Sequence, residues 1–287
     1  MPKDKFSATW VSHSSIADFL SCPRAYFLRN VWKRPETNHK VQIISPALSL
    51  GSAVHEVVES LSVLPTDKRF FEPLLPKFEI AWEKFTGLAG GFFDIETEFR
   101  FKTRGMEMMN RITKHPGPLS NLAVKINMDL PYFWIAEDQN IILCGKIDWL
   151  EYFKNEDAVR IIDFKTSKTE EKEDSLQLPI YLLLAQNCQS RKIKEAAYWY
   201  LQSSDELSPK KLPDANEAKE KILKIAKEIK LARALNKLSC KTGGCKSCIP
   251  LEKIFRGEAQ FVGINSFGQD CFAIPFEPSS KPEETIL

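Results

Sequence analysis

Asp163 and Lys165 lie close together in the apolar segment AVRIIDFK, where two charged side chains need a reason. Side chains alternate along a β-strand, so both would share one face while Phe164 points to the other. Asp148 follows Gly145 in an earlier apolar segment, CGKIDWL. If the two segments are neighbouring strands, two carboxylates meet beside an ammonium. Such carboxylates repel each other, and a hard cation such as Mg²⁺ relieves that repulsion.

Lys165 would then orient or activate a water molecule and stabilise the charge that develops on a phosphate. The simpler interpretation is a strand-end ion pair between Asp163 and Lys165. For a lone Asp-x-Lys that interpretation is favoured, because short motifs recur by chance. The surrounding motifs change the balance, since the pair stands within an ordered series.

Five motifs in order resemble the PD-(D/E)XK nuclease superfamily in its RecB-like branch, which includes the RecB and AddB nuclease domains and the CRISPR adaptation nucleases. They are SSIADFLSCPRAYFL, LGSAVHEVVE, Gly145-x-x-Asp148, Asp163-x-Lys165 and Gln177-x-x-x-Tyr181. The resemblance covers residues 14–60, 141–202 and 240–250, and leaves 65–125 and the tail after 250 uncovered. It implies a restriction-endonuclease-like α/β core, with a mixed sheet flanked by helices.

The resemblance also implies a role for each matching residue. The metal ligands for Mg²⁺ or Mn²⁺ would be His55, Asp148, Asp163 and the backbone carbonyl of Phe164. Lys165 would be the catalytic lysine, and Gln177 and Tyr181, which share a helical face, would contact the active site or the nucleic-acid backbone. Two ordinary alternatives stay open: His55 as a core histidine, and Tyr181 as core packing in the apolar run LPIYLLLA. The acidic stretch TEEKED is interpreted as a solvated connection.

A second candidate site is the cysteine cluster in SCKTGGCKSC, where Cys240, Cys245 and Cys248 need a fourth ligand. Cys22 is the best candidate, and it would close a loop of 218 positions (240 minus 22). Closing so long a loop restricts the unfolded chain, so a structural role is expected. Members of the resembled branch often carry a [4Fe-4S] cluster on such cysteines, so the resemblance implies one here. The order of the spacings is reversed here, which leaves open Zn²⁺ on the same ligands, Cys271 as the fourth ligand, or four unrelated thiols.

Several elements must position these groups. Helices are predicted over 12–33, with a Ser15–Asp18 capping box and Pro23 opening a second helix, and over 49–64, 176–188 and 216–237. Strands are predicted over 130–136, 141–153, 158–165 and 195–202, with a hairpin turn at 137–140. The chain is predicted to be one α/β nuclease domain over 1–287. Residues 65–125 would form a helical insertion or lid, and 238–250 the cysteine cluster that closes on Cys22.

With these residues, the resemblance implies a metal-dependent DNA nuclease that acts on single-stranded DNA or a DNA end, in DNA repair, recombination or CRISPR adaptation. Net charge is only +2, so any basic groove is local; Arg24 and Lys146 are candidate phosphate contacts. The alternatives are a non-catalytic subunit serving a helicase or CRISPR integration complex, and a site-specific restriction enzyme. Seven cysteines, an odd number, fit a reducing compartment. No apolar run approaches the ~18 residues of a membrane helix and no signal-peptide core is present, so a cytoplasmic address is expected.

Overall fold

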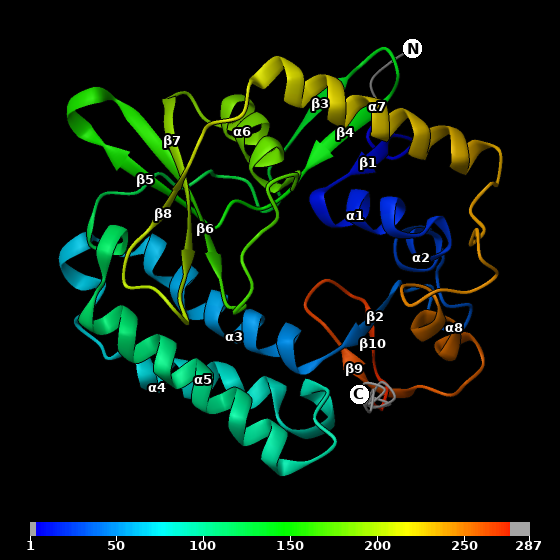
Figure 1. The fold of residues 1–287 in the computed structure, drawn as a ribbon, viewed down its shortest axis with the longest axis horizontal. Helices are drawn as coiled ribbons and strands as arrows, with labels where there is room; N and C mark the ends of the chain where they lie inside the picture. Colours follow the sequence, from blue (N-terminus) through cyan, green and yellow to red (C-terminus); the bar gives the residue numbers. More distant parts are fainter. Residues whose placement is uncertain (1–3, 276–287) are drawn as a thin grey trace, which may run out of the picture.

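The computed structural model describes residues 4–275, which form three mixed sheets flanked by helices (Figure 1). The sheets have the strand orders β1-β4-β3, β2-β10-β9 and β5-β6-β7-β8. The strands are β1 (Thr9–Val11), β2 (Val41–Ile44), β3 (Tyr132–Ala136), β4 (Ile141–Cys144), β5 (Trp149–Phe153), β6 (Ala158–Lys165), β7 (Lys192–Tyr200), β8 (Ser208–Lys210), β9 (Gln260–Ile264) and β10 (Asp270–Ala273). The α-helices are α1 (His13–Ser21), α2 (Pro23–Tyr26), α3 (Pro46–Ser60), α4 (Leu74–Trp82), α5 (Ile95–Lys114), α6 (Gln177–Cys188), α7 (Ala215–Ala234) and α8 (Ile249–Phe255).

The predicted α/β class is confirmed, but the single predicted sheet is divided. The stretch 141–153, predicted as one strand, breaks into β4 and β5, which belong to different sheets. Gly145 marks the break: a Cβ there would lie 3.0 Å from Leu184 of α6, so the chain passes close to that helix as it leaves β4. Asp148 therefore lies in the connection directly before β5, not inside a strand.

The four-stranded sheet carries the predicted charged residues on its central strand, β6. β5 is antiparallel to β6 with Trp149 opposite Ile162, and β7 is parallel to it with Asp163 opposite Tyr198. The alternation predicted from the sequence is confirmed. Phe164 packs in a hydrophobic cluster with α3, α4 and α5, whereas Tyr198, the partner of Asp163, packs in the cluster formed with α6 and α7.

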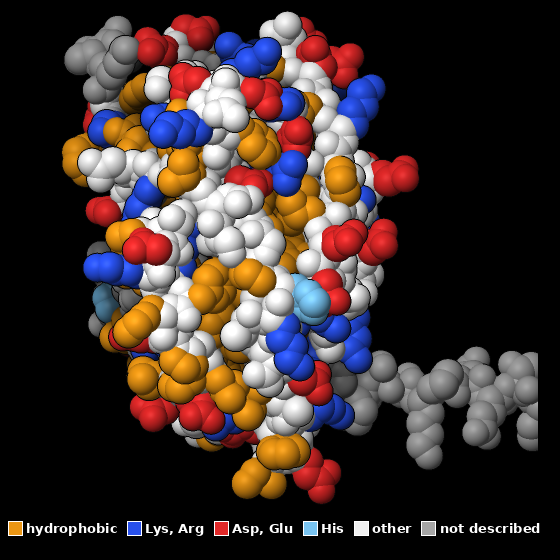
Figure 2. All heavy atoms as spheres, turned by 90° about the vertical axis from the view of Figure 1, so that its left-hand side faces the viewer, with side chains coloured by type: hydrophobic (Ala, Val, Ile, Leu, Met, Phe, Trp, Pro, Cys, Tyr) orange, Lys and Arg blue, Asp and Glu red, His pale blue; other side chains and the backbone are white. Residues whose placement is uncertain are grey.

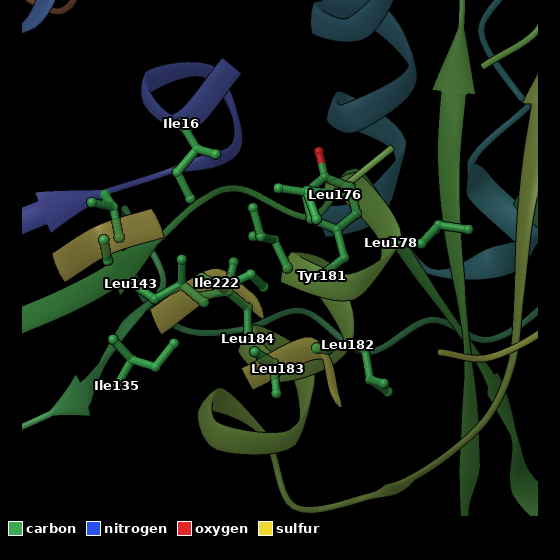
Figure 3. Packing of buried hydrophobic residues seen from close by; sticks show 14 of the residues in the cluster. Ile16, Ile135, Leu143, Leu176, Leu178, Tyr181, Leu182, Leu183, Leu184 and Ile222 are labelled. Carbon is green, nitrogen blue, oxygen red and sulfur yellow. The ribbon is translucent and has the colours of Figure 1, made fainter. Parts of the chain in front are cut away.

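Helix α6 is covered by apolar side chains from several elements. Figure 3 shows Ile16 of α1, Leu143 of β4 and Ile222 of α7 around it. All are buried, and α6 has a low exposed fraction along its whole middle section, consistent with an almost uniformly apolar sequence. This packing fixes the beginning of α6, from which Gln177 projects beside β6.

The region 65–125 is helix-rich, as predicted, and its helices α4 and α5 pack against α3. Phe78 and Trp82 of α4 and Met108 of α5 are buried in the cluster that also contains Phe164. The approach is close, because a Cβ at Gly105 of α5 would lie 2.1 Å from the Phe78 ring. Whether this region is an insertion or lid remains a prediction.

The first helix begins with a different cap from the one predicted. Ser12 is the N-cap of α1 and forms a capping box with Ser15, whose side chain accepts from the Ser12 backbone N–H at 2.8 Å. Asp18 instead accepts hydrogen bonds from Arg29 (2.6 Å) and Asn30 (3.0 Å). The prediction that Pro23 opens a second helix is confirmed.

Charges of both signs are interspersed on the face seen in Figure 2, with hydrophobic side chains between them. This mixing agrees with the small net charge of +2. Among residues 4–275, no helix is long and apolar enough to span a bilayer.

The sheet β2-β10-β9 was not predicted. A buried carboxylate in β10 binds side chains of the segment 34–39, which directly precedes β2. Asp270 of β10 is fully buried, and it accepts hydrogen bonds from Thr37 Oγ1 (2.7 Å) and Arg34 Nη1 (3.2 Å). His39 Nδ1 lies 2.8 Å from its other oxygen. Burial alone would raise the pKa of Asp270, but these hydrogen bonds outweigh burial and hold the pKa below its ordinary value.

We expect Asp270→Asn to lower the free energy of unfolding by about 2 kcal/mol, because Arg34 loses one of its two carboxylate partners and keeps only Glu36, 3.0 Å away. Because the folded-state pKa is depressed, this contribution is present above the ordinary carboxyl pKa of about 4 and is lost as the pH falls below it. Urea unfolding followed by circular dichroism between pH 3 and 7 measures both effects. The exposed Asp67→Asn is the matched control, and equal stability of the two variants would contradict the prediction.

Candidate active site

Three predicted groups converge where α3 crosses the end of the four-stranded sheet. His55 of α3 places its Nε2 atom 3.1 Å from the backbone oxygen of Phe164, and its Nδ1 atom 3.6 Å from Asp148 Oδ1. The Phe164 backbone N–H donates to Asp148 Oδ2 at 2.9 Å. The register of β5 on β6 brings these groups together, since Asp148 directly precedes the residue paired with Ile162.

Glu59 is a fourth member that the sequence interpretation missed. Ligand atoms of His55, Glu59 and Asp148 all lie within 4.8 Å of one another and could hold a metal ion. Glu59 follows His55 by one helical turn, and that spacing was the signal available in the sequence. Lys146, a predicted phosphate contact, forms an ion pair with Glu59.

Asp163 stands beside this group rather than within it. Its Oδ1 atom accepts a hydrogen bond from Gln177 Nε2 at 2.7 Å, and its Oδ2 atom lies 2.9 Å from Lys165 Nζ. Oδ2 is buried, and the Lys165 ammonium neutralises it. A carboxylate oxygen has more lone pairs than one ammonium fills, so Asp163 could still accept a divalent cation beside Lys165.

Burial and neighbouring charge act together on the carboxylates. Burial, with contributions from Asp163 and Glu59, raises the pKa of Asp148 to about 7, although His55 acts in the opposite direction. The charged form of Asp148 is therefore disfavoured in the protein alone. A bound divalent cation would offset both the burial and the repulsion, so this donor set of imidazole and carboxylates fits Mg²⁺ or Mn²⁺.

Gln177 and Tyr181 lie on one face of α6, as predicted. Gln177 Nε2 is 3.2 Å from the Tyr181 hydroxyl, and its Oε1 atom accepts from Lys165. The Tyr181 ring is buried in the apolar cluster around α6 (Figure 3). Burial, reinforced by Asp148 and Asp163, raises its pKa well above the ordinary value, so the hydroxyl stays protonated. Tyr181 thus packs in the core and presents a polar tip to the site.

The acidic stretch after β6 is not wholly a solvated connection. Glu171 Oε2 lies 2.9 Å from Lys165 Nζ, and hydrogen bonding to Lys165 holds the pKa of Glu171 below its ordinary value even though burial acts to raise it. His13 of α1 is a further neighbour: burial lowers its pKa, and Glu171, Lys165 and Asp163 are the charges that act on it. The loop position of Glu171 could not be read from the sequence.

The four predicted cysteines form a second group, far from these carboxylates in the chain. The Sγ atoms of Cys22, Cys240, Cys245 and Cys248 all lie within 4.8 Å of one another. Cys22 directly follows α1, and Cys248 directly precedes α8, so the group joins a segment near the beginning of the chain to one near its end. Cys271 lies in β10 and is not a member. Arg24, the other predicted phosphate contact, pairs with Glu252 at 2.6 Å beside this cluster.

The cysteines differ in how readily they ionise. Hydrogen bonds from Thr242 lower the pKa of Cys240 to about 6, whereas burial raises that of Cys248 to about 12 and also raises that of Cys22. A buried thiolate without a cation is therefore unfavourable at two of the four positions. A metal ion removes that penalty, so the donor set is compatible with an iron–sulfur cluster or Zn²⁺.

The chain belongs to the PD-(D/E)XK nuclease superfamily: residues 10–265 match the family model with that description. Nucleases of this superfamily use divalent metal ions, which agrees with the donor set at His55, Glu59 and Asp148.

A similar solved structure is that of a "putative exonuclease" from Eubacterium rectale, with 13% identity and a TM-score of 0.48 over 93% of this chain and 96% of that chain. No curated protein matches the chain.

Proposed function

We propose that the protein is a Mg²⁺- or Mn²⁺-dependent deoxyribonuclease that hydrolyses phosphodiester bonds in single-stranded DNA or at a DNA end. The observation that carries this proposal is that the candidate metal ligands lie next to the predicted catalytic pair. The candidate metal ligands His55, Glu59 and Asp148 adjoin the Asp163–Lys165 pair through the backbone of Phe164. The same motifs support the RecB-like branch of the superfamily.

Each group has a task in this proposal. A divalent cation bound there supplies a polarised phosphate and a nucleophilic water. His55 and the carboxylates hold the site, and Asp163 fixes Lys165 and Gln177 on either side of its own carboxylate. The Lys165 side chain is 14% exposed, so its positive charge lies in a partly desolvated position, where it would stabilise the negative charge that develops on a bound phosphate.

The cysteine group is proposed as a structural metal centre. The resemblance favours a [4Fe-4S] cluster. The reversed order of the cysteine spacings keeps Zn²⁺ on the same four ligands as the alternative. Iron and zinc contents of anaerobically purified protein decide between them: brown iron-containing protein supports the cluster, and colourless zinc-containing protein excludes it.

The direct test is cleavage of fluorescently labelled single-stranded, blunt-duplex and closed-circular DNA with Mg²⁺, Mn²⁺ or EDTA. We expect metal-dependent cleavage that EDTA abolishes, with linear single strands degraded faster than closed circles. Progressive trimming would separate this enzyme from a restriction enzyme, which gives discrete products. DNA binding without cleavage under all metal conditions would refute the proposal and favour a non-catalytic subunit of a helicase or CRISPR integration complex.

A further inference from the structure

The Lys165 ammonium is fully occupied before any substrate arrives. An ammonium has three N–H donors, and three acceptors surround this one. Asp163 Oδ2 and Glu171 Oε2 each lie 2.9 Å from Lys165 Nζ, and Gln177 Oε1 accepts a hydrogen bond from it. A phosphate can therefore be bound by Lys165 only if one of these acceptors moves away.

The three acceptors differ in how firmly they are held. Asp163 lies within β6 and is bound on its other oxygen by Gln177, which is itself the first residue of α6. Glu171 lies in the connection 166–176, which contains no helix or strand. The backbone of Glu171 is held by a hydrogen bond from its N–H to the Tyr200 hydroxyl at 2.9 Å. Glu171 is therefore the acceptor that can leave with the least disruption.

The Glu171 carboxylate is also chemically similar to the phosphodiester that would replace it beside Lys165. Its carboxylate is an oxygen anion bound to the ammonium, as a phosphodiester oxygen would be. Its side chain is 26% exposed, so solvent and substrate can reach it, whereas that of Asp163 is 3% exposed. Two anions competing for one partly buried ammonium make a displacement, rather than a simultaneous contact, the expected outcome.

We propose that Glu171 is a positioning residue that occupies Lys165 as a tethered anion and is displaced by the incoming phosphodiester, with the 166–176 loop opening as it leaves. The inference rests on the proposed nuclease function. It assigns the loop a role in substrate binding: every substrate that engages Lys165 must first break the Glu171 contact.

Glu171→Gln tests this directly, because it retains the size and polarity of the side chain and removes the competing charge. We expect its KM for a single-stranded oligonucleotide to fall about two- to fivefold, the range for loss of a partly exposed ion pair, with kcat unchanged. Glu173→Gln is the matched control. Glu173 lies on the same loop, is exposed, and makes no ion pair or hydrogen bond among the described residues, so it reports the general effect of removing one negative charge.

Two kinetic results would overturn the inference. A fall in kcat for Glu171→Gln at unchanged KM would make Glu171 part of the catalytic step. A fall in KM equal to that of Glu173→Gln would assign the effect to net charge.

Hydrogen–deuterium exchange provides a readout that needs no cleavage. In the wild type, adding a single-stranded oligonucleotide should speed exchange of the Glu171 amide and its neighbours in 166–176. In Glu171→Gln exchange should already be fast without DNA. If DNA opens the loop but the protein cleaves no DNA, the displacement of Glu171 is supported and the proposed nuclease function is refuted. If the wild type cleaves DNA while its loop stays protected from exchange, the nuclease function is supported and the displacement of Glu171 is refuted.

Discussion

Replacing Asp163 with asparagine is expected to reduce metal-dependent DNA cleavage by at least about 1,000-fold, which corresponds to about 4 kcal/mol of lost transition-state stabilisation. Asp163 supplies a buried carboxylate beside the candidate metal ligands and fixes both Lys165 and Gln177. The substitution changes one oxygen to an amide nitrogen, so it removes the charge with little change of shape. Initial rates with Mn²⁺ on a labelled single strand measure the loss.

The matched control is Asp67→Asn, the same change at an exposed position in the short helical turn 66–68, outside the site and the 166–176 loop. It should retain wild-type cleavage, and both variants should keep the wild-type circular dichroism spectrum. Manganese titration by calorimetry adds a second readout: binding should weaken in Asp163→Asn and stay unchanged in the control. Equal cleavage rates for the two variants would remove Asp163 from the active site, and with it the mechanism proposed above.

The part of this site that could be predicted is the part governed by local periodicity. Alternation along one strand was enough to place Asp163 and Lys165 together and Phe164 opposite, and the helical repeat was enough to pair Gln177 with Tyr181. The same repeat would have identified Glu59, one turn after His55. These relations depend on the chain's own geometry and hold wherever the element is placed.

What could not be predicted depends on contacts between distant segments. The break after β4 arises because Gly145 passes Leu184, a residue of a later helix. The sheet β2-β10-β9 joins strands from opposite ends of the chain, and each is too short to show a clear alternation. The contact between Glu171 and Lys165 depends on the path of a loop. Sequence patterns carry no comparable signal for any of these three.

The cysteine group depends on both local spacing and a distant contact. Its spacing in the sequence identified three ligands, and the contact of Cys22 with them across the chain leads to the second prediction. Cys22→Ser is expected to remove the bound metal and to lower the free energy of unfolding by about 5 kcal/mol, the chain-entropy value for opening a clasp over so long a loop. For a chain of 287 residues that corresponds to a fall in Tm of roughly 8 °C. Metal analysis and thermal unfolding of the anaerobic protein measure the two effects.

Two control variants make the same chemical change elsewhere. Cys188→Ser alters a half-buried thiol of α6 outside the cluster, and Cys271→Ser tests the thiol that the sequence left open as a fourth ligand. Both should retain the metal and lose little stability. The predicted difference in Tm should also disappear when wild type and Cys22→Ser are compared after the metal has been removed from both. Neither protein then has a metal that links Cys22 to the other three cysteines. A difference that persists without metal would mean that Cys22 acts by packing against α8 and its neighbours, since it is itself buried there.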